Sequence, residues 1–131
     1  MGIERDFLMR QMMQLFDVLQ RILGHRAKGE KEEAEKQIRY FYTILKWDSD
    51  IRKLNIEELI TYVREEKKLG NDQIEVLAFV LKEQGELADR EDERLDFFRK
   101  AWFLLNEVER ESAVFSMGRQ MKLTELKAYL N

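Results

Sequence analysis

Apolar side chains recur along this chain at intervals of three and four residues, which is the spacing of one face of an α-helix. In residues 6–23 that face is formed by Leu8, Met12, Leu15, Phe16, Leu19, Ile22 and Leu23. The same spacing returns in residues 30–47, 55–69, 73–89 and 93–111. The pattern predicts an all-α protein with five to six helices and no strands.

Short polar joints predict how these helices pair. We expect Gly24 to end the first helix, because glycine is the usual residue after a helix C-terminus. The joint over residues 25–28 is so short that the next helix has to run antiparallel, which makes residues 6–47 a helix hairpin. A second hairpin is expected over 73–111, with a bridging helix over 55–69 between the two.

Two capping patterns predict where helices begin. Asn55 is followed three residues later by Glu58, and Asp72 is followed in the same way by Glu75. In such a capping box, the first side chain accepts a hydrogen bond from the helix backbone and the second reaches back to the cap. We therefore expect helices to start just after Asn55 and just after Asp72.

The C-terminal tail is predicted to add one more helix, over about 113–130, that caps an apolar edge of the array. Gly118 lies near its start and could either interrupt or end a turn, so the course of the chain there is left open. A chain of 131 residues is the size of one domain. We expect a single helical domain, 1–131.

Composition excludes several classes of protein. Of the residues, 44% are apolar and 37% are charged, and there is neither cysteine nor proline, so disulfide scaffolds, thiol enzymes and zinc–thiolate sites are excluded. The longest apolar run, residues 101–105, is far shorter than the roughly 18 residues of a membrane span. The start of the chain lacks the features of a signal peptide. We expect a cytoplasmic protein with no membrane partner.

Charge argues against nucleic acid as a partner. The net charge is −3, and basic and acidic residues are interleaved, as in residues 28–33 and 64–68. Proteins that bind nucleic acid usually carry a basic face, because neutralising phosphate dominates their affinity. Interleaved charges are instead typical of solvated helix faces.

Residues that carry catalysis or bind metals are sparse. A di-iron site in a helix bundle needs two Glu-x-x-His motifs, whereas this chain has one histidine, His25, and no such motif. Ser49, Ser112 and Ser116 lie in no Gly-x-Ser-x-Gly motif, and the six glycines are scattered rather than clustered as in a phosphate loop. We predict no catalytic residue, no metal site, no cofactor and no enzymatic activity.

The first predicted helix carries more apolar surface than one stripe requires. Eleven of the seventeen residues from Phe7 to Leu23 are apolar, so this helix is either central in the bundle or part of an interface, and both interpretations stay open. Methionine is common at adaptable binding surfaces. The candidate interaction surface consists of Phe7, Met9, Met12, Met13 and Phe16. It leads to the hypothesis of a non-enzymatic adaptor or scaffold that binds a protein or peptide and also associates with itself.

Aromatic residues near the joints support an alternative hypothesis. A pocket between the hairpins would make the protein a helical module that senses a small molecule. The candidate pocket residues are Tyr42, Trp47, Tyr62 and Trp102. Stacked helix hairpins would also bury such aromatic side chains between their layers.

The second predicted hairpin resembles a tetratricopeptide repeat. The residues that carry the resemblance are Leu81-x-x-Gln84-Gly85-x-x-Ala88 followed by Phe98-x-x-Ala101. In this motif Gly85 stands where the two helices of a repeat approach closely. The resemblance implies a tetratricopeptide-like array of antiparallel helix hairpins and carries no specific function.

The N-terminal region carries a second resemblance. The opening Glu4-Arg5-Asp6-Phe7-Leu8-Met9-Arg10-Gln11 and the turn Lys28-Gly29-Glu30-Lys31-Glu32-Glu33-Ala34 are similar to a family of small bacterial all-helical proteins. Membership would imply a cytoplasmic bacterial protein with a helical-repeat fold. That family has no assigned reaction, so the resemblance assigns no role to any residue.

Overall fold

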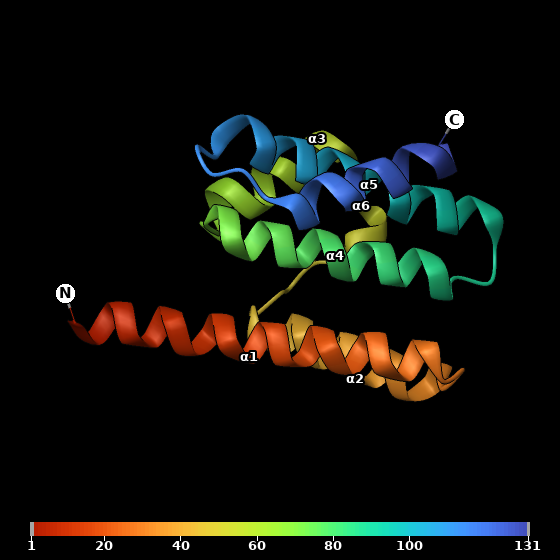
Figure 1. The fold of residues 1–131 in the computed structure, drawn as a ribbon, viewed down its shortest axis with the longest axis horizontal. Helices are drawn as coiled ribbons and strands as arrows, with labels where there is room; N and C mark the ends of the chain where they lie inside the picture. Colours follow the sequence, from red (N-terminus) through yellow and green to blue (C-terminus); the bar gives the residue numbers. More distant parts are fainter. Residues whose placement is uncertain (1, 131) are drawn as a thin grey trace. The chain divides into compact units, whose positions relative to one another are not determined.

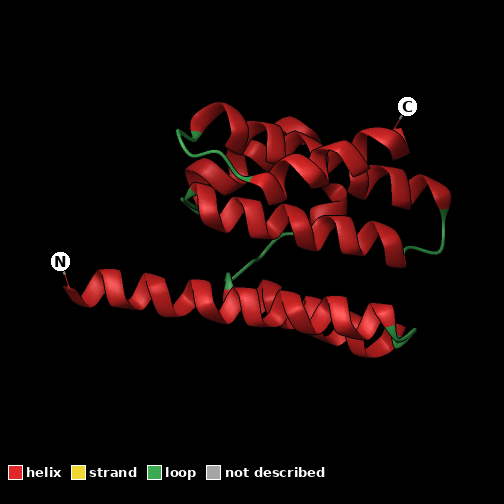
Figure 2. Cartoon of the chain, in the orientation of Figure 1, coloured by secondary structure: helices red, strands yellow, loops and turns green. Residues whose placement is uncertain are grey.

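A computed structural model describes the backbone of residues 2–130 and the side chains of residues 4–130. Within this part of the chain there are six α-helices and no strand (Figures 1 and 2), as predicted. The helices are α1 (Gly2–Ala27), α2 (Lys31–Ile44), α3 (Ile56–Thr61), α4 (Asn71–Leu87), α5 (Glu91–Glu111) and α6 (Met117–Leu130). A 3₁₀ turn, Ile51–Lys53, precedes α3, and a π-helical turn, Tyr62–Glu66, follows it.

The chain divides into two compact units, Met1–Asp48 and Ser49–Asn131. The first unit holds α1 and α2, and the second holds α3 to α6. The expectation of one domain over 1–131 stays a prediction.

In the first unit, α1 and α2 form the predicted antiparallel hairpin. The prediction that Gly24 ends the first helix was wrong, since α1 continues to Ala27. The turn is made instead at Gly29, whose φ of 74° lies in the left-handed region that glycine adopts without strain. The backbone N–H of Glu30 then donates to the carbonyl of His25 at 2.9 Å, which closes the end of α1.

The buried residues of the first unit follow the predicted helical spacing. They are Leu15, Val18, Leu19 and Ile22 on α1, with Ala34, Ile38, Phe41 and Leu45 on and just after α2. The helix predicted over 30–47 ends earlier, at Ile44, and Lys46 adopts a positive φ of 53°. Continuing the helix is incompatible with that backbone conformation, so the chain leaves α2 there.

In the second unit, α4 and α5 form the other predicted hairpin, over Asn71–Glu111 rather than 73–111. Gly85 permits a close approach between them, as the sequence indicated. A Cβ atom at this position would lie 2.5 Å from Cε1 of Phe98 and 3.2 Å from the backbone oxygen of Arg94. Phe98 is fully buried, so its ring has no open space into which it could move.

The start of α3 confirms the first capping prediction. The Asn55 side chain accepts a hydrogen bond from the N–H of Glu58 at 2.8 Å, and the Glu58 carboxylate accepts one from the N–H of Asn55 at 2.9 Å. The α-helix itself is shorter than the predicted 55–69. It passes at residue 62 into the π-helical turn, which ends at Glu66.

The second capping prediction was wrong. The helix α4 begins after Gly70, and its cap is the side chain of Gln73, which accepts a hydrogen bond from the Gly70 N–H at 2.9 Å. Asp72 lies inside the first turn of α4. Glu75 instead forms an ion pair with Arg119, whose Nη1 lies 2.7 Å from the Glu75 carboxylate.

The last helix, α6, begins at Met117 and not at about 113. Ser116 caps it, because the Ser116 hydroxyl accepts a hydrogen bond from the Arg119 N–H at 3.1 Å. Gly118 lies in the first turn of α6 and does not interrupt it. Residues 112–116 form the turn between α5 and α6.

Packing of α6 against α4 and α5 combines apolar and charged contacts. Leu126 is fully buried, and the ring of Tyr129 stacks on that of Phe98 with 4.7 Å between ring centroids. The Lys82 ammonium lies 3.2 Å from the Glu125 carboxylate. The tail helix therefore covers part of the α4–α5 hairpin.

Candidate interaction surfaces

Part of the predicted interaction surface lies on the stretch of α1 that extends beyond α2. At 1.5 Å per residue, the 26 residues of α1 span about 39 Å and the 14 residues of α2 about 21 Å. Since the two helices join at the C-terminal end of α1, its N-terminal end projects past α2, as Figure 1 shows. The Gln14 side chain donates to the Tyr40 hydroxyl at 2.9 Å, and α2 continues for four residues past Tyr40, to Ile44. The predicted surface therefore begins beyond α2 and continues, as far as Phe16, alongside it.

Four of the five predicted surface residues are exposed, and the fifth is half-buried. Phe7 is 60% exposed, Met9 56%, Met13 69% and Phe16 46%, while Met12 is half-buried. Leu8, which the prediction did not include, is also exposed. We call these six residues the α1 surface. Exposure of this many large apolar side chains on adjacent turns is unusual for a protein without a partner.

The α1 surface contains two faces of the helix. Leu8 lies seven residues before Leu15 and fourteen before Ile22, so it continues the buried stripe of α1 out past the end of α2. Met9, Met12, Met13 and Phe16 have the spacing i, i+3, i+4, i+7 and form a second stripe, roughly a third of the circumference away. We call this second set the methionine stripe.

Both open interpretations of the first helix therefore apply, each to a different set of its residues. The buried set is Leu15, Val18, Leu19 and Ile22. The exposed α1 surface begins nearer the N-terminus and overlaps the buried set in sequence at Phe16, which lies on another face of the helix. Sequence periodicity alone did not separate the two sets, because both show the same apolar spacing.

A second exposed apolar surface lies at the turn between α5 and α6, and the sequence analysis missed it. Its members, which we call the turn surface, are Val114, Phe115, Met117 and Met121. These residues were assigned to a helix that covers an apolar edge. The signal that could have located the turn is the pair Ser112 and Ser116, since serine favours helix ends and turns.

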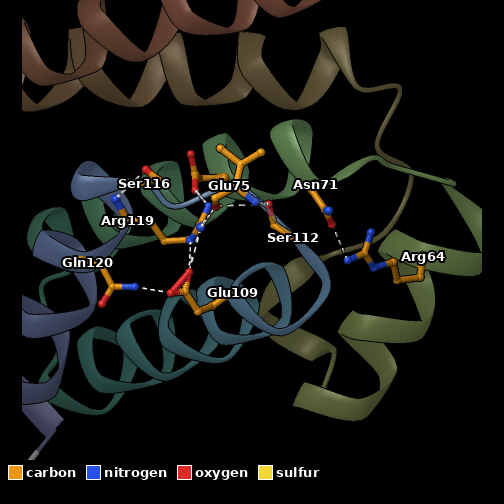
Figure 3. Close-up of polar contacts among 9 residues, drawn as sticks. Arg64, Asn71, Glu75, Glu109, Ser112, Ser116, Arg119 and Gln120 are labelled. Atoms are coloured by element: carbon orange, nitrogen blue, oxygen red, sulfur yellow. Dashed lines mark hydrogen bonds and ion pairs between the residues drawn. The ribbon is translucent and has the colours of Figure 1, made fainter.

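A buried arginine holds the turn surface in place (Figure 3). Arg119 is 4% exposed, and its guanidinium donates to the carboxylates of Glu75 on α4 at 2.7 Å and Glu109 on α5 at 2.8 Å. It also donates to the backbone carbonyl of Val114 at 2.7 Å. Burial lowers the pKa of Arg119, but the bonds to both carboxylates outweigh it and raise that pKa above its ordinary value. A single side chain thus bonds the turn to both helices of the hairpin.

Other buried charges in the second unit also have structural partners. The ammonium of Lys100 donates to the carbonyl of Ile51 at 2.9 Å and to the carboxylate of Asp96 at 2.6 Å, which ties the 3₁₀ turn to α5. Half-buried Arg64 likewise donates to the side-chain oxygen of Asn71 at 2.7 Å, as Figure 3 also shows. Such bonds are the condition under which charged groups are buried without a large loss of stability.

The four candidate pocket residues are distributed over both units. In the first unit, the rings of Tyr42 and Trp47 meet edge to face with 5.4 Å between centroids, and burial raises the pKa of Tyr42. In the second unit, Tyr62 is buried, and half-buried Trp102 meets the ring of Phe103 at 5.1 Å. A pocket lined by all four side chains stays a prediction.

The residues that the structure describes contain no group of three or more histidine, aspartate or glutamate side chains that could hold a metal ion. None of their helices combines the length and the apolar character that crossing a membrane requires.

Comparison with protein-family models, with curated proteins and with solved structures finds no match to this chain. The resemblance to small bacterial helical proteins therefore stays a prediction. Any function has to be argued from the α1 surface and the turn surface, which the fold places on different units.

Proposed function

We propose that this protein is a non-enzymatic adaptor or scaffold that binds a protein or peptide partner through the α1 surface. The observation that carries the proposal is the exposure of Phe7, Met9, Met13 and Phe16 over about three successive turns of α1, which begin on the stretch that projects beyond α2. Apolar groups of this size gain free energy when a partner removes them from water. We expect the partner to bury these side chains.

The chemistry of the α1 surface favours a helical or extended peptide as the partner. Aromatic residues anchor interfaces, and methionine adapts its shape to different partners because it is unbranched and flexible. An amphipathic helix with anchors at i, i+3, i+4 and i+7 would match the methionine stripe along its length. The net charge of −3 and the interleaved charges support a protein partner over nucleic acid.

The proposal includes the tetratricopeptide-like character of the hairpins and a cytoplasmic location in a bacterial cell. The first is supported by the close approach of α4 and α5 at Gly85, where the repeat motif also has a small residue. The second is supported by the absence of cysteine from the sequence.

Peptide selection tests the proposal without a known partner. A phage-displayed library of helical peptides is selected against the intact protein, and the affinities of the selected peptides are then measured by fluorescence anisotropy. We expect the variant Met9→Asp with Met13→Asp to bind them at least about tenfold more weakly, because two charges would be buried in an apolar contact.

The matched control is Val114→Asp with Phe115→Asp, which places the same charges on the turn surface. This control should bind the peptides as the unmodified protein does. Selected peptides that bind the α1 variant with unchanged affinity would show that the α1 surface is not the binding site.

A further inference from the structure

We infer that the α1 surface is covered by a second copy of this chain, in an antiparallel dimer whose two-fold axis passes between Met12 and Met13. The inference rests on the proposed function, because it assigns an occupant to the same surface. It also adds a mode of control, since a bound peptide and the second copy exclude one another.

The methionine stripe is self-complementary when one helix is reversed against another. A two-fold axis between Met12 and Met13 brings Met9 level with the partner's Phe16 and Met12 level with the partner's Met13. Each large side chain then faces another large side chain of the opposite helix. Met9 and Phe16 stand at the two ends of the stripe, so it is used along its whole length.

Polar residues are compatible with the same register. Arg5 lies one helical turn before Met9, and Gln20 lies one turn after Phe16; both are exposed. In this register Arg5 of one copy comes level with Gln20 of the other. The arrangement therefore has an apolar centre and a polar rim, which is the usual anatomy of an interface.

The area is that of a weak pair. With side-chain areas of about 150–250 Å², the exposed fractions of Leu8, Met9, Met13 and Phe16 amount to roughly 400 Å² per protomer. Two copies would bury about 800 Å² of this apolar surface together with the polar rim, which is in the range of weak, transient interfaces. An interface of this size is weak enough for a peptide to compete with it.

Light scattering over a concentration series tests the dimer directly. We expect a mass of two chains at high concentration that falls toward one chain on dilution. Met9→Asp with Met13→Asp should be a monomer throughout, whereas Val114→Asp with Phe115→Asp should dimerise as the unmodified chain does. Circular dichroism verifies the fold of both variants. A monomeric unmodified chain, or a dimer that survives the α1 substitutions, would overturn the inference.

Cysteine cross-linking tests the register, and the cysteine-free sequence makes it specific. A mixture of Met9→Cys and Phe16→Cys proteins should form the mixed disulfide under mild oxidation. Met9→Cys alone should not cross-link, because the two copies of residue 9 would be about 10 Å apart along the helices, beyond the reach of a disulfide. Efficient cross-linking of Met9→Cys alone would indicate a parallel pair and overturn the antiparallel register.

The same proteins separate this inference from the proposed function. A monomer that binds selected peptides through the α1 surface would overturn the dimer and leave the adaptor function in place. A dimer with the expected register that selects no peptide would support the dimer and overturn the adaptor function. When both hold, adding a selected peptide should lower the mass measured by light scattering from two chains toward one chain plus peptide.

Discussion

Gly24 and Gly85 both lie inside helices, yet a side chain would meet different surroundings at the two positions. At Gly24 a Cβ atom would find no other atom within 4 Å. At Gly85 it would overlap the ring of Phe98, which is fully buried. In the sequence, the repeat-like spacing around Gly85 is the one feature that distinguished Gly85 from Gly24.

Alanine at the two positions should therefore change stability in opposite directions. Gly24→Ala is expected to stabilise the protein by about 0.5–1 kcal/mol, because alanine is the better helix former. Gly85→Ala is expected to destabilise it by roughly 1–3 kcal/mol through overpacking against Phe98. Urea titration followed by circular dichroism measures both, and a stabilising Gly85→Ala would contradict the close approach of α4 and α5.

Arg119, in the first turn of α6, bonds the α5–α6 turn to both α4 and α5. Arg119→Met keeps much of its length but leaves the carboxylates of Glu75 and Glu109 without the guanidinium, so we expect a loss of about 2–4 kcal/mol. The exposed Arg99, on the same unit, serves as the control, and Arg99→Met should change stability by less than about 0.5 kcal/mol. Equal urea midpoints for the two variants would rule out an anchoring role for Arg119.

At the scale of elements, the helix start predicted at Asn55 was correct, because it depends on local contacts alone. Asn55 and Glu58 are three residues apart, and their reciprocal hydrogen bonds need nothing else from the fold. Asp72 and Glu75 have the same spacing, but Glu75 is paired with Arg119 of α6, 44 residues later in the chain. Whether Glu75 bonds back to a helix cap or pairs with Arg119 is therefore decided by the packing of α6 on α4.

The contact between α6 and α4 should depend on pH through Glu125. Partial burial raises the pKa of Glu125, but the hydrogen bond from Lys82 and the charges of Lys82 and Lys122 outweigh it, so that pKa lies below its ordinary value of 4.5. A carboxylate of this kind stabilises the fold above its unfolded pKa and loses the contribution as pH falls through its folded pKa.

Glu125→Gln removes that contribution at every pH. At pH 7 the variant should be less stable than the unmodified protein, by less than about 1 kcal/mol, because water screens the half-exposed carboxylate. The difference should disappear as pH falls below 4.5. Thermal unfolding at pH 7, 5, 4 and 3 measures it, and a difference that does not shrink between pH 5 and pH 3 would exclude the ion pair as its cause.

At the scale of the whole molecule, the two units differ in how much apolar surface they bury. Of the buried apolar residues in the described part of the chain, eighteen lie in Ser49–Asn131 and eight in Met1–Asp48. A small unit buries a smaller share of its surface on folding and is correspondingly less stable.

Expressing the units separately tests this difference. Residues 49–131 should fold alone, with a helical circular dichroism spectrum and one cooperative thermal transition. Residues 1–48 in dilute solution should be only partly helical, because a single hairpin has few tertiary contacts to offset the entropy of ordering its helices. A fragment 49–131 without a cooperative transition would contradict the division into units.

The candidate surfaces differ in how far the sequence could predict them. Phe7, Met9, Met13 and Phe16 were identified from sequence because one helix had more apolar residues than one buried stripe needs. Val114 and Phe115 were not, because an apolar residue in a predicted capping helix is expected to be buried. Their exposure depends on a turn that Arg119 holds from α4 and α5.

The sequence by itself determined the all-helical class, the two hairpins and the capping box at Asn55, because these follow from spacing and neighbouring residues. It also determined that the first helix has surplus apolar residues. Tertiary structure alone decided that α1 continues past Gly24, that its N-terminal half extends beyond α2, and that the turn surface is exposed. Those outcomes depend on which parts of a helix pack against other segments, and these segments are distant in the sequence.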